Sequence, residues 1–459
     1  MKNDFLSTIA AVSTPRGKGG IALIRISGEE AVATAGRCFS PKCGKTVAEL
    51  APRTAVFGDI ISDGVAIDDG MITVFKAPAS YTGEDLVEIS CHGGVLVTER
   101  VLEAVFKAGA VPAAAGEFTR RAFVNGKLSL TKAEAVGEIL EAKSDAQLKV
   151  AATARRGAMS KKIDEAIHAL TALIADVYAR IDYPDEDLSE IGDDEFARRA
   201  EKVRTSLISL RDTYRAGSAI FEGVKTVICG APNRGKSSLY NAIAGEDAAI
   251  VTEIAGTTRD ILERDIPLGK VLLHLTDTAG IHETSDTVEK IGVKRAEERL
   301  ACAELIICVL DGSTALTAED TSLFEKLKDT SAPKIAVLNK CDIAAADIKL
   351  PEGIFEKEVR MSAKNGDGID RLKAAVEELF IDEKIDTSAD AMVTNARQFA
   401  ALDEAVNLIA DAISTAKGIG ADLASSDLER AVSTLGELDG KAVSESVVAE
   451  IFSRFCVGK

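Results

Sequence analysis

The stretch TVICGAPNRGKSS, residues 226–238, decides the central fold of this chain. An apolar run ends in G-x-x-x-x-G-K-S, and LYNAIAG at 239–245 continues as the start of a helix. A strand, a glycine-rich turn and a helix in this order form a phosphate-binding P-loop, in which Gly230 and Gly235 let backbone amides face the phosphates. The sequence therefore predicts a nucleotide-binding α/β domain around this segment.

Four shorter strings follow in an order typical of GTPases with high specificity, such as translation factors. GTTRD (256–260) offers Thr258 to magnesium, and DTAG (277–280) offers Asp277 to the metal and the Gly280 amide to the γ-phosphate. NKCD (339–342) ends an apolar run, so Asp342 can accept two hydrogen bonds from guanine that adenine does not supply. SAK (362–364) would lie behind the base.

Lys236 is expected to reach the β- and γ-phosphates and Ser237 to ligate magnesium. The predicted GTP-binding residues are Asn233, Arg234, Gly235, Lys236, Ser237, Ser238, Thr252, Glu253, Ile254, Ala255, Gly256, Thr257, Thr258, Asp277, Thr278, Ala279, Gly280, Asn339, Lys340, Asp342, Ser362, Ala363 and Lys364.

Composition narrows the class of protein. The chain has 459 residues and a formal net charge of −18, so it should repel nucleic acid except at a local basic patch or through a partner. It shows neither a signal peptide nor an apolar run long enough to cross a bilayer. Its eight cysteines form no C-x-x-C pair. We expect a reduced cytoplasmic protein with no membrane contact and no zinc site.

The pattern of apolar runs and glycine or proline turns predicts an α+β N-terminal domain over 1–124, with strands in GGIALIRISG and EDLVEIS. A helical domain follows in two parts, 125–220 and 383–459, which flank an inserted α/β P-loop GTPase domain at 221–382. The apolar runs of the inserted domain alternate with helices, which indicates a parallel sheet covered on both faces. The two helical parts are expected to join in one bundle. Two apolar helix faces that precede the insertion support this expectation. The first contains Ile163, Ile167, Leu170, Ile174, Val177 and Ile181, and the second contains Val203, Leu207, Leu210 and Tyr214.

The hydrolytic machinery departs from the best-known switch GTPases. Ile281 follows DTAG where a glutamine would orient water, and no arginine finger is evident. A monovalent cation held by Asn233 would supply the missing charge; alternatively, Asn233 only stabilises the turn. Glu289 is a candidate to position water, or else a solvated charge on a helix.

The ordered GTPase motifs, the helical flanks and the terminal CVGK together resemble the MnmE (TrmE) family of tRNA modification GTPases. The resemblance spans the whole chain through GGIALIRISG, YTGEDLVEISCHGG, GEFTRRAFVNGKLSLTKAEA and CVGK (456–459). It implies an N-terminal folate-binding domain that makes a homodimer, and a discontinuous helical domain carrying a G domain. It also implies potassium-promoted dimerisation of G domains, and an MnmG-like FAD protein as partner. The pair would place an aminomethyl or carboxymethylaminomethyl group on C5 of the wobble uridine of certain tRNAs, with 5-formyltetrahydrofolate or a related folate as the one-carbon source.

The resemblance also assigns residues. It implies K⁺ ligands at Asn233, Thr252, Ile254 and Thr257, Mg²⁺ ligands at Ser237 and Thr258, water positioning by Glu289, and folate contacts at Arg25, Glu88, Lys127 and Lys459. Arg25 and Glu88 each lie between two apolar residues of a strand, so each should face away from them; an ordinary surface charge is the alternative for both. Cys456 would be a nucleophile or redox-sensitive thiol, or else a small buried residue.

One residue departs from the pattern of the family. His282 stands where many relatives carry arginine, which puts any switch contact of that arginine in doubt.

Two rival functions stay open. A ribosome-assembly GTPase is the first rival, but such proteins usually add a basic RNA-binding domain, and here a helical segment ending in CVGK follows instead. The second rival is a folate-dependent one-carbon enzyme whose GTPase is only regulatory.

Overall fold

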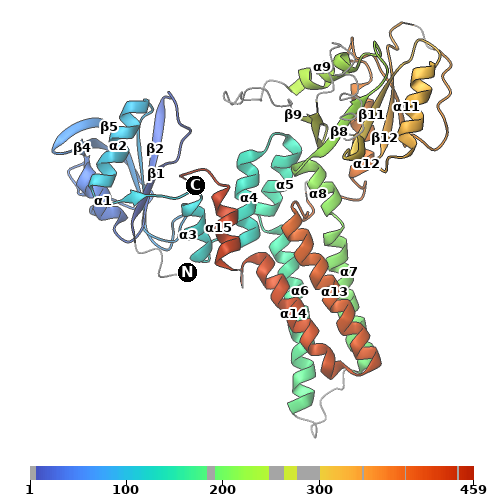
Figure 1. Ribbon diagram of the computed structural model, residues 1–459. Helices are drawn as coiled ribbons and strands as arrows, with labels where there is room; N and C mark the ends of the chain where they lie inside the picture. Colours follow the sequence, from blue (N-terminus) through green and yellow to red (C-terminus); the bar gives the residue numbers. More distant parts are fainter. Residues whose placement is uncertain are drawn as a thin grey trace, which may run out of the picture. The chain divides into compact units, whose positions relative to one another are not determined.

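The structure is a computed structural model that describes residues 7–182, 192–247, 263–276, 300–343, 346–387, 389–441 and 444–458. The chain divides into two compact units, which we describe separately. Unit 1 comprises Met1–Gly137, Arg155–Ile167 and Val432–Lys459, and unit 2 comprises Glu138–Ala154 and His168–Ala431. Figure 1 shows the elements of both.

Unit 1 begins with a seven-stranded sheet in the order β3-β4-β5-β6-β2-β1-β7. All neighbouring strands are antiparallel except β1 and β7. The strands are β1 (Ile9–Val12), β2 (Ile21–Ser27), β3 (Phe39–Pro41), β4 (Ala55–Ser62), β5 (Val65–Phe75), β6 (Leu86–His92) and β7 (Val111–Pro112). Helices α1 (Ala31–Cys38) and α2 (Val95–Lys107) and the short 3₁₀ helix η2 (Val47–Glu49) accompany them.

The alternation in β2 and β6 decides which side chains enter the core. Ile24, Ile26, Val87 and Ile89 are fully buried in one cluster with residues of α1 and α2. Because successive strand residues point to opposite faces, Arg25 and Glu88 lie on the other face of the sheet. The two strands predicted from GGIALIRISG and EDLVEIS are therefore confirmed.

The rest of unit 1 is helical. It contains α3 (Glu117–Val124), α15 (Glu445–Ser453), most of α4 (Leu130–Glu141), the start of α6 (Ala158–Asp182) and the end of α14 (Ala421–Asp439). Segments from before and after the nucleotide domain meet here, because Thr131 and Ser160 both donate to Oδ1 of Asp439, at 2.6 Å and 2.9 Å. Leu130 and Phe452 share one small core.

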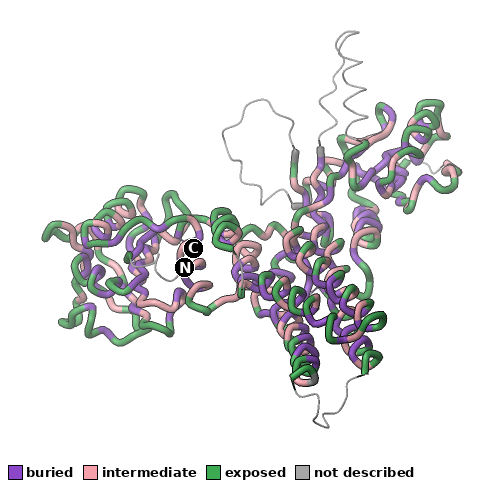
Figure 2. Tube along the Cα trace, turned by 60° about the horizontal axis from the view of Figure 1, so that its bottom comes forward, coloured by how far each residue is buried: buried purple, intermediate pink, exposed green. Residues whose placement is uncertain are grey.

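Outside the nucleotide domain, unit 2 contains α5 (Asp145–Arg155), α7 (Asp193–Arg211), α8 (Tyr214–Phe221) and α13 (Ala396–Gly418), with parts of α4, α6 and α14. Helices α7 and α13 lie side by side (Figure 1) and turn buried residues inward while exposed residues face outward (Figure 2). Nη1 of Arg211 donates to Oδ1 of Asp403 across this pair, at 2.9 Å. Helical segments on the two sides of the insertion thus pack together.

Ile181 lies on α6 as predicted, near the end of the helix, where it is 48% exposed. One detail of the helical prediction is wrong. The helix with Val203, Leu207 and Leu210 ends at Arg211, and Tyr214 begins a separate helix. The break is stabilised by the hydroxyl of Thr213, which donates to the carbonyl of Leu210 at 2.6 Å.

The nucleotide domain is built on a six-stranded sheet in the order β13-β12-β11-β8-β10-β9. Its strands are β8 (Val224–Cys229), β9 (Glu263–Leu268), β10 (Val271–Thr276), β11 (Leu305–Asp311), β12 (Lys334–Asn339) and β13 (Lys357–Arg360), with helices α9 (Lys236–Asp247), α11 (Ala318–Lys328) and α12 (Ile369–Phe380). The sheet is parallel except at β9, which pairs antiparallel with β10. The predicted parallel sheet thus has one antiparallel edge strand, because Gly269, at φ 65°, allows a two-residue turn that joins β9 directly to β10.

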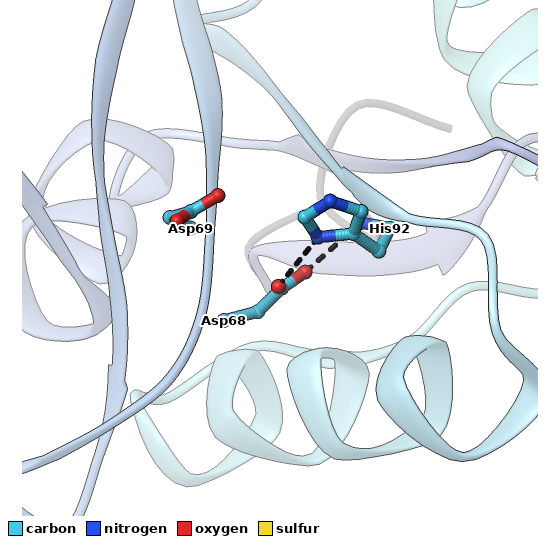
Figure 3. A group of neighbouring side chains, drawn as sticks. All are labelled: Asp68, Asp69 and His92. Atoms are coloured by element: carbon cyan, nitrogen blue, oxygen red, sulfur yellow. Dashed lines mark hydrogen bonds and ion pairs between the residues drawn. The ribbon is translucent and has the colours of Figure 1, made fainter.

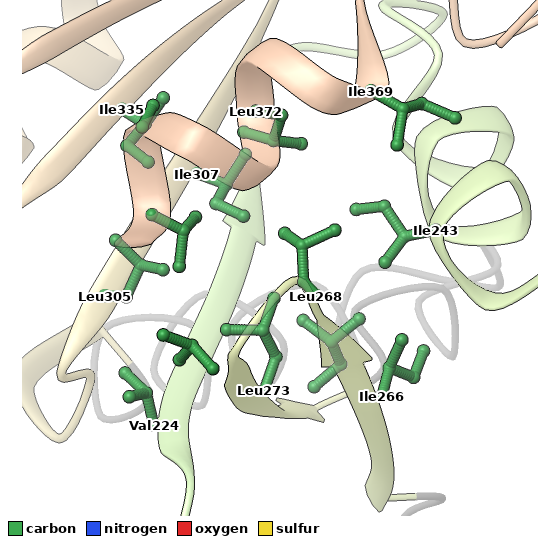
Figure 4. Close-up of a cluster of buried hydrophobic side chains, with 14 of the residues drawn as sticks. Val224, Ile243, Ile266, Leu268, Leu273, Leu305, Ile307, Ile335, Ile369 and Leu372 are labelled. Carbon is green, nitrogen blue, oxygen red and sulfur yellow. The ribbon is translucent and has the colours of Figure 1, made fainter. Parts of the chain in front are cut away.

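Strand β11 shows why this sheet needs helices on both faces. All seven of its residues are buried. Leu305, Ile307 and Val309 enter a cluster with residues of α9 and α12, while Ile306, Cys308 and Leu310 enter a second cluster with α11. Figure 4 shows Leu305 and Ile307 in the first cluster beside Ile335 and Leu372.

Candidate functional site

Residues 230–235 form a tight loop between the end of β8 and the start of α9. Its backbone has positive φ angles at Gly230 (148°), Asn233 (61°) and Gly235 (93°). A Cβ atom on Gly235 would lie 2.2 Å from Nδ2 of Asn339, so this position admits only glycine without displacing its neighbour. The loop therefore has the shape that turns backbone amides toward an anion at a helix N-terminus.

Lys236 crosses back over the loop. Its Nζ donates to the carbonyl oxygens of Gly230 at 2.8 Å and Ala231 at 3.0 Å. Burial lowers the pKa of this lysine, because a desolvated ammonium group is disfavoured. A phosphate placed in the loop would restore the lost stabilisation of the charge. Ser237 and Ser238 are exposed in the first turn of α9, where their hydroxyls can reach a ligand.

The base-reading side is assembled from the ends of β12 and β13. Asn339 is buried and joins two motifs, since its Nδ2 donates to the carbonyl of Arg234 at 3.0 Å and its Oδ1 accepts from the amide of Ala363 at 2.9 Å. Lys340 has φ 66°, and its Nζ donates to Oδ2 of Asp311 at 2.7 Å. The P-loop, NKCD and SAK motifs thus form one connected site.

Asp342 has the features that a guanine-reading carboxylate needs. Oδ1 accepts a hydrogen bond from the hydroxyl of Ser362 at 2.7 Å. This bond, assisted by the charge of Lys364, holds the pKa of Asp342 below its usual value. The carboxylate stays ionised and can accept from the N1–H and amino groups of guanine, which discriminates against bases without those donors.

Arg234 is placed differently from the other loop residues. Its guanidinium is bound to Thr317 and Asp320 at the start of α11, and its side chain is 10% exposed. Only the backbone of Arg234 therefore faces the site. Sequence reasoning did not identify Asp320 as a partner of the P-loop, because nothing local to either residue signals the contact.

Part of the predicted site lies outside the described residues. This applies to Thr252, Glu253, Ile254, Ala255, Gly256, Thr257, Thr258, Asp277, Thr278, Ala279, Gly280, Ile281, His282, Glu289 and Lys459. Their predicted roles stay predictions.

A second candidate site lies on the sheet of unit 1. Arg25 on β2 stands opposite Glu88 on β6, and both Nε and Nη2 of Arg25 donate to Oε1 of Glu88, at 3.0 Å and 2.7 Å. The guanidinium lies 5.5 Å from the ring centroid of Tyr81 and 5.6 Å from that of Phe118. The arrangement offers a charged pair beside an aromatic surface, which suits a flat heterocycle bearing polar groups.

The other predicted residues of this region that the structure describes are Lys127 and Cys456. Lys127 is exposed, and its Nζ donates to the carbonyl of Pro78 at 2.9 Å. Cys456 is exposed, so the alternative of a small buried residue is wrong. The C-terminal tail is held on unit 1, because Ser13 donates to the carbonyl of Gly458 at 2.9 Å and Ala115 forms an isolated bridge with Val457.

Sequence reasoning missed a buried arginine beneath this second site. Arg121 is fully buried on α3, where it pairs with Glu84 at 3.1 Å and Glu117 at 2.8 Å and donates to the carbonyl of Ser7 at 3.0 Å. Ser27 of β2 also donates to Glu84, at 2.8 Å. The i,i+4 spacing of Glu117 and Arg121 was the only local signal for this network.

A cluster of Asp68, Asp69 and His92 lies on β5 and β6 (Figure 3), with ligand atoms within 4.8 Å of one another. Both carboxylate oxygens of Asp68 are already engaged by His92, one by the backbone amide at 2.9 Å and the other by Nδ1 at 2.7 Å. The hydrogen bond that His92 donates to Asp68 raises the pKa of His92. We therefore interpret the cluster as a polar tie between two strands.

The fold and the site define a P-loop GTPase, a GTP hydrolase. A family model described as the MnmE helical domain matches residues 130–456, and one described as the GTP-binding protein TrmE N-terminus matches residues 8–127. The chain belongs to the MnmE family.

Full-length relatives agree with this assignment. The tRNA modification GTPase MnmE of Clostridioides difficile (strain 630) is 39% identical over 456 residues, which cover 98% of this chain and 99% of the relative. That of Geobacillus kaustophilus (strain HTA426) is 40% identical over 466 residues, covering 98% and 99%. That of Thermotoga petrophila is 38% identical over 464 residues, covering 99% and 100%. Across the described ranges, the helices are too short or too polar to span a bilayer.

Proposed function

We propose that this chain couples GTP hydrolysis to modification of tRNA. In this proposal it acts with an MnmG-like FAD protein to add an aminomethyl or carboxymethylaminomethyl group at C5 of the wobble uridine of certain tRNAs. The proposal is supported by membership of the MnmE family and by the names of its relatives, which are tRNA modification GTPases. A tRNA substrate would place the protein in the cytoplasm.

The observation that carries the GTPase part is the connected geometry of the P-loop and the base-reading residues. Water attacks the γ-phosphorus, the bond to the bridging oxygen breaks, and GDP and phosphate leave. Lys236 and the loop amides would stabilise the charge that develops between the β- and γ-phosphates. Glu289 is proposed to position the water, and this residue lies outside the described ranges.

The residues that would hold metal ions fit that role where they are described. Ser237 is exposed at the N-terminus of α9 and would ligate Mg²⁺ with Thr258. Asn233 is exposed in a left-handed conformation, and its side chain would hold K⁺ with Thr252, Ile254 and Thr257. The two cations would supply positive charge to the phosphates, as an arginine finger does in other GTPases.

We propose a folate site at Arg25, Glu88, Lys127 and Lys459. Within the described ranges Arg25 engages Oε1 of Glu88, so Oε2 would be available to donors on a pterin ring. The rings of Tyr81 and Phe118 border the same guanidinium and would lie beside the heterocycle. The lysines would pair with the glutamate tail of 5-formyltetrahydrofolate or a related folate. Cys456 would act near this site as a nucleophile or redox-sensitive thiol.

We further propose that the N-terminal domain forms a homodimer and that paired G domains close in potassium and open after hydrolysis. The insertion of the G domain into the helical domain supports this opening and closing, because both chain connections of an inserted domain transmit its movement to the domain that carries it. In this scheme GTP hydrolysis drives the conformational cycle and leaves the carbon chemistry to the folate and flavin.

Nucleoside mass spectrometry of tRNA tests the proposal. Deleting the gene should remove the C5 modification of wobble uridine, and a variant with Asp342→Asn should fail to restore it. Unchanged modification together with defective ribosomal subunits would instead favour a ribosome-assembly GTPase. Modification that continues at the wild-type rate with the Asp342 variant would reject the coupling to GTP and favour a regulatory GTPase.

Potassium is tested separately on the purified protein. Hydrolysis should be faster in potassium than in sodium, and Asn233→Ala should remove the difference. Equal rates in the two salts would reject the cation site and leave the assignment of the GTPase intact.

A further inference from the structure

The side chain of Arg234 forms a buried ion pair in the middle of the P-loop. Its Nη2 lies 2.7 Å from Oδ2 of Asp320, and the two side chains are 10% and 2% exposed. The same nitrogen donates to the hydroxyl of Thr317 at 3.0 Å. A pair so far from water is little screened by salt, and each charge depends on the other for compensation.

Asp320 performs a second task at the same time. Oδ2 accepts from the amide of Thr317 at 2.9 Å, while the amide of Asp320 donates to the hydroxyl of Thr317 at 3.3 Å. These bonds form a capping box at the N-terminus of α11. The start of α11 and the centre of the phosphate loop are therefore joined by one carboxylate oxygen.

Neither ion of the pair is fully satisfied. Within the described ranges, Nε of Arg234 and Oδ1 of Asp320 are buried without a hydrogen-bond partner. An unpaired buried polar atom is costly. The ion pair is therefore formed despite the cost of these two unpaired atoms. Such costs are common in functional sites, where a residue has a positioning role.

Arg234 also connects the phosphate loop to the base-reading motif. Its carbonyl accepts from Nδ2 of Asn339 at 3.0 Å. Its Nη1 lies 3.8 Å from Oδ2 of Asp311, the carboxylate oxygen that Lys340 contacts at 2.7 Å. The backbone and the side chain of one loop residue therefore both lead to the NKCD motif.

We propose that the Arg234–Asp320 pair is a positioning element that holds the P-loop in its phosphate-binding shape. The side chain itself does not contact the nucleotide. It anchors the residue between Asn233 and Gly235, so that the amides of the loop need not be ordered when GTP binds. Preorganisation of this kind strengthens binding mainly by removing an entropic cost. Loss of the pair should therefore weaken nucleotide binding more than it slows the chemical step.

The experiment uses the full-length protein with Arg234→Met, which keeps an unbranched side chain without the guanidinium charge, and Asp320→Asn. We expect each variant to raise the KM for GTP and the release rate of a fluorescent GDP analogue by about tenfold or more, because the loop would then have to be ordered when the nucleotide binds. The kcat should stay within about threefold. Arg234→Lys should restore part of the affinity. Glu319→Gln, an exposed charge one residue before Asp320, is the matched control and should change nothing.

Thermal unfolding with and without saturating GDP separates positioning from stability alone. The proposal expects the stabilisation by GDP to shrink in the variants. Lower thermal midpoints with unchanged KM and unchanged GDP release would show a merely structural pair and overturn it. A lower kcat at unchanged KM would also overturn it. If either single variant fails to fold, the double variant Arg234→Met with Asp320→Asn removes both charges, and the same outcomes decide.

Discussion

The hydroxyl of Ser362 donates to Oδ1 of Asp342 at 2.7 Å, across 20 residues of sequence. It orients the carboxylate and lowers its pKa. Base recognition thus depends on the end of β12 and on the loop after β13 together, and both contributions can be tested.

Asp342→Asn should change the base that the site prefers. An asparagine replaces one acceptor by a donor, so it opposes the amino group of guanine and matches the carbonyl of xanthine. We expect kcat/KM for GTP to fall at least about hundredfold and that for XTP to rise. Steady-state hydrolysis of both nucleotides measures this. An unchanged preference for GTP would show that Asp342 does not read the base.

Ser362→Ala should have a smaller effect in the same direction. The variant loses the hydrogen bond that orients the carboxylate and leaves the acceptor oxygens in place. We expect GTP affinity to fall about fivefold to tenfold, which corresponds to the net contribution of one typical hydrogen bond. Ser331→Ala, on an exposed loop, is the control. Equal affinities for the Ser362 and Ser331 variants, measured by calorimetry, would contradict the role of this bond.

The Asp68–His92 tie predicts a pH dependence. The hydrogen bond and the charge of Asp68 raise the pKa of His92 in the folded state above its usual value. The stabilisation is therefore fully present below the unfolded pKa of the imidazole and is lost as the pH rises through the folded pKa. The difference in thermal midpoint between the wild type and Asp68→Asn should shrink over that range.

An NMR titration of His92 gives a direct measurement, with Asp69→Asn as the control for a neighbouring charge. We expect an upward-shifted titration that Asp68→Asn returns toward the ordinary value. A titration of the wild type at or below the usual value would contradict the interpretation.

The buried Arg121 network should be important for the stability of unit 1. Arg121→Met leaves Glu84 and Glu117 without their buried cation, which should cost about 3–5 kcal/mol. The exposed pair of Arg100 and Glu103, 64% and 56% exposed, is the matched control, and Arg100→Ala should cost under about 1 kcal/mol. Hydrogen exchange of peptides that cover β2 and β6 measures both. Similar protection in the two variants would reject a stabilising role for the network.

The conformation of Gly458 predicts that the C-terminal tail needs glycine there. Its φ is 98°, and a Cβ atom would lie 2.2 Å from the carbonyl oxygen of Val12. Gly458→Ala should detach the tail and, if Lys459 binds folate as proposed, weaken 5-formyltetrahydrofolate binding about tenfold or more. GTP hydrolysis should be unaffected. Ser453→Ala, an exposed residue at the end of α15, leaves the tail in place and is the control. Folate binding that is equal in both variants would contradict a role for the tail position.

Local patterns predicted much of this protein. The P-loop, NKCD and SAK motifs could be read from the sequence because each is a short string of characteristic residue types. The strands with Arg25 and Glu88 were also readable, because alternation of apolar and polar residues places both side chains on one face. The hairpin of β9 and β10 and the break before Tyr214 were missed, because turn geometry overrode the general periodicity there.

The sequence by itself thus determined the class of fold, the order of the GTPase motifs and the residue types that read phosphate and guanine. Only the tertiary structure decided which side chains contact one another. Arg234 and Asp320 are 86 residues apart, and Ser13 and Gly458 are 445 apart. Strand register and helix packing bring such residues together, and they depend on the burial of apolar surface over the whole domain, which no short pattern in the chain specifies.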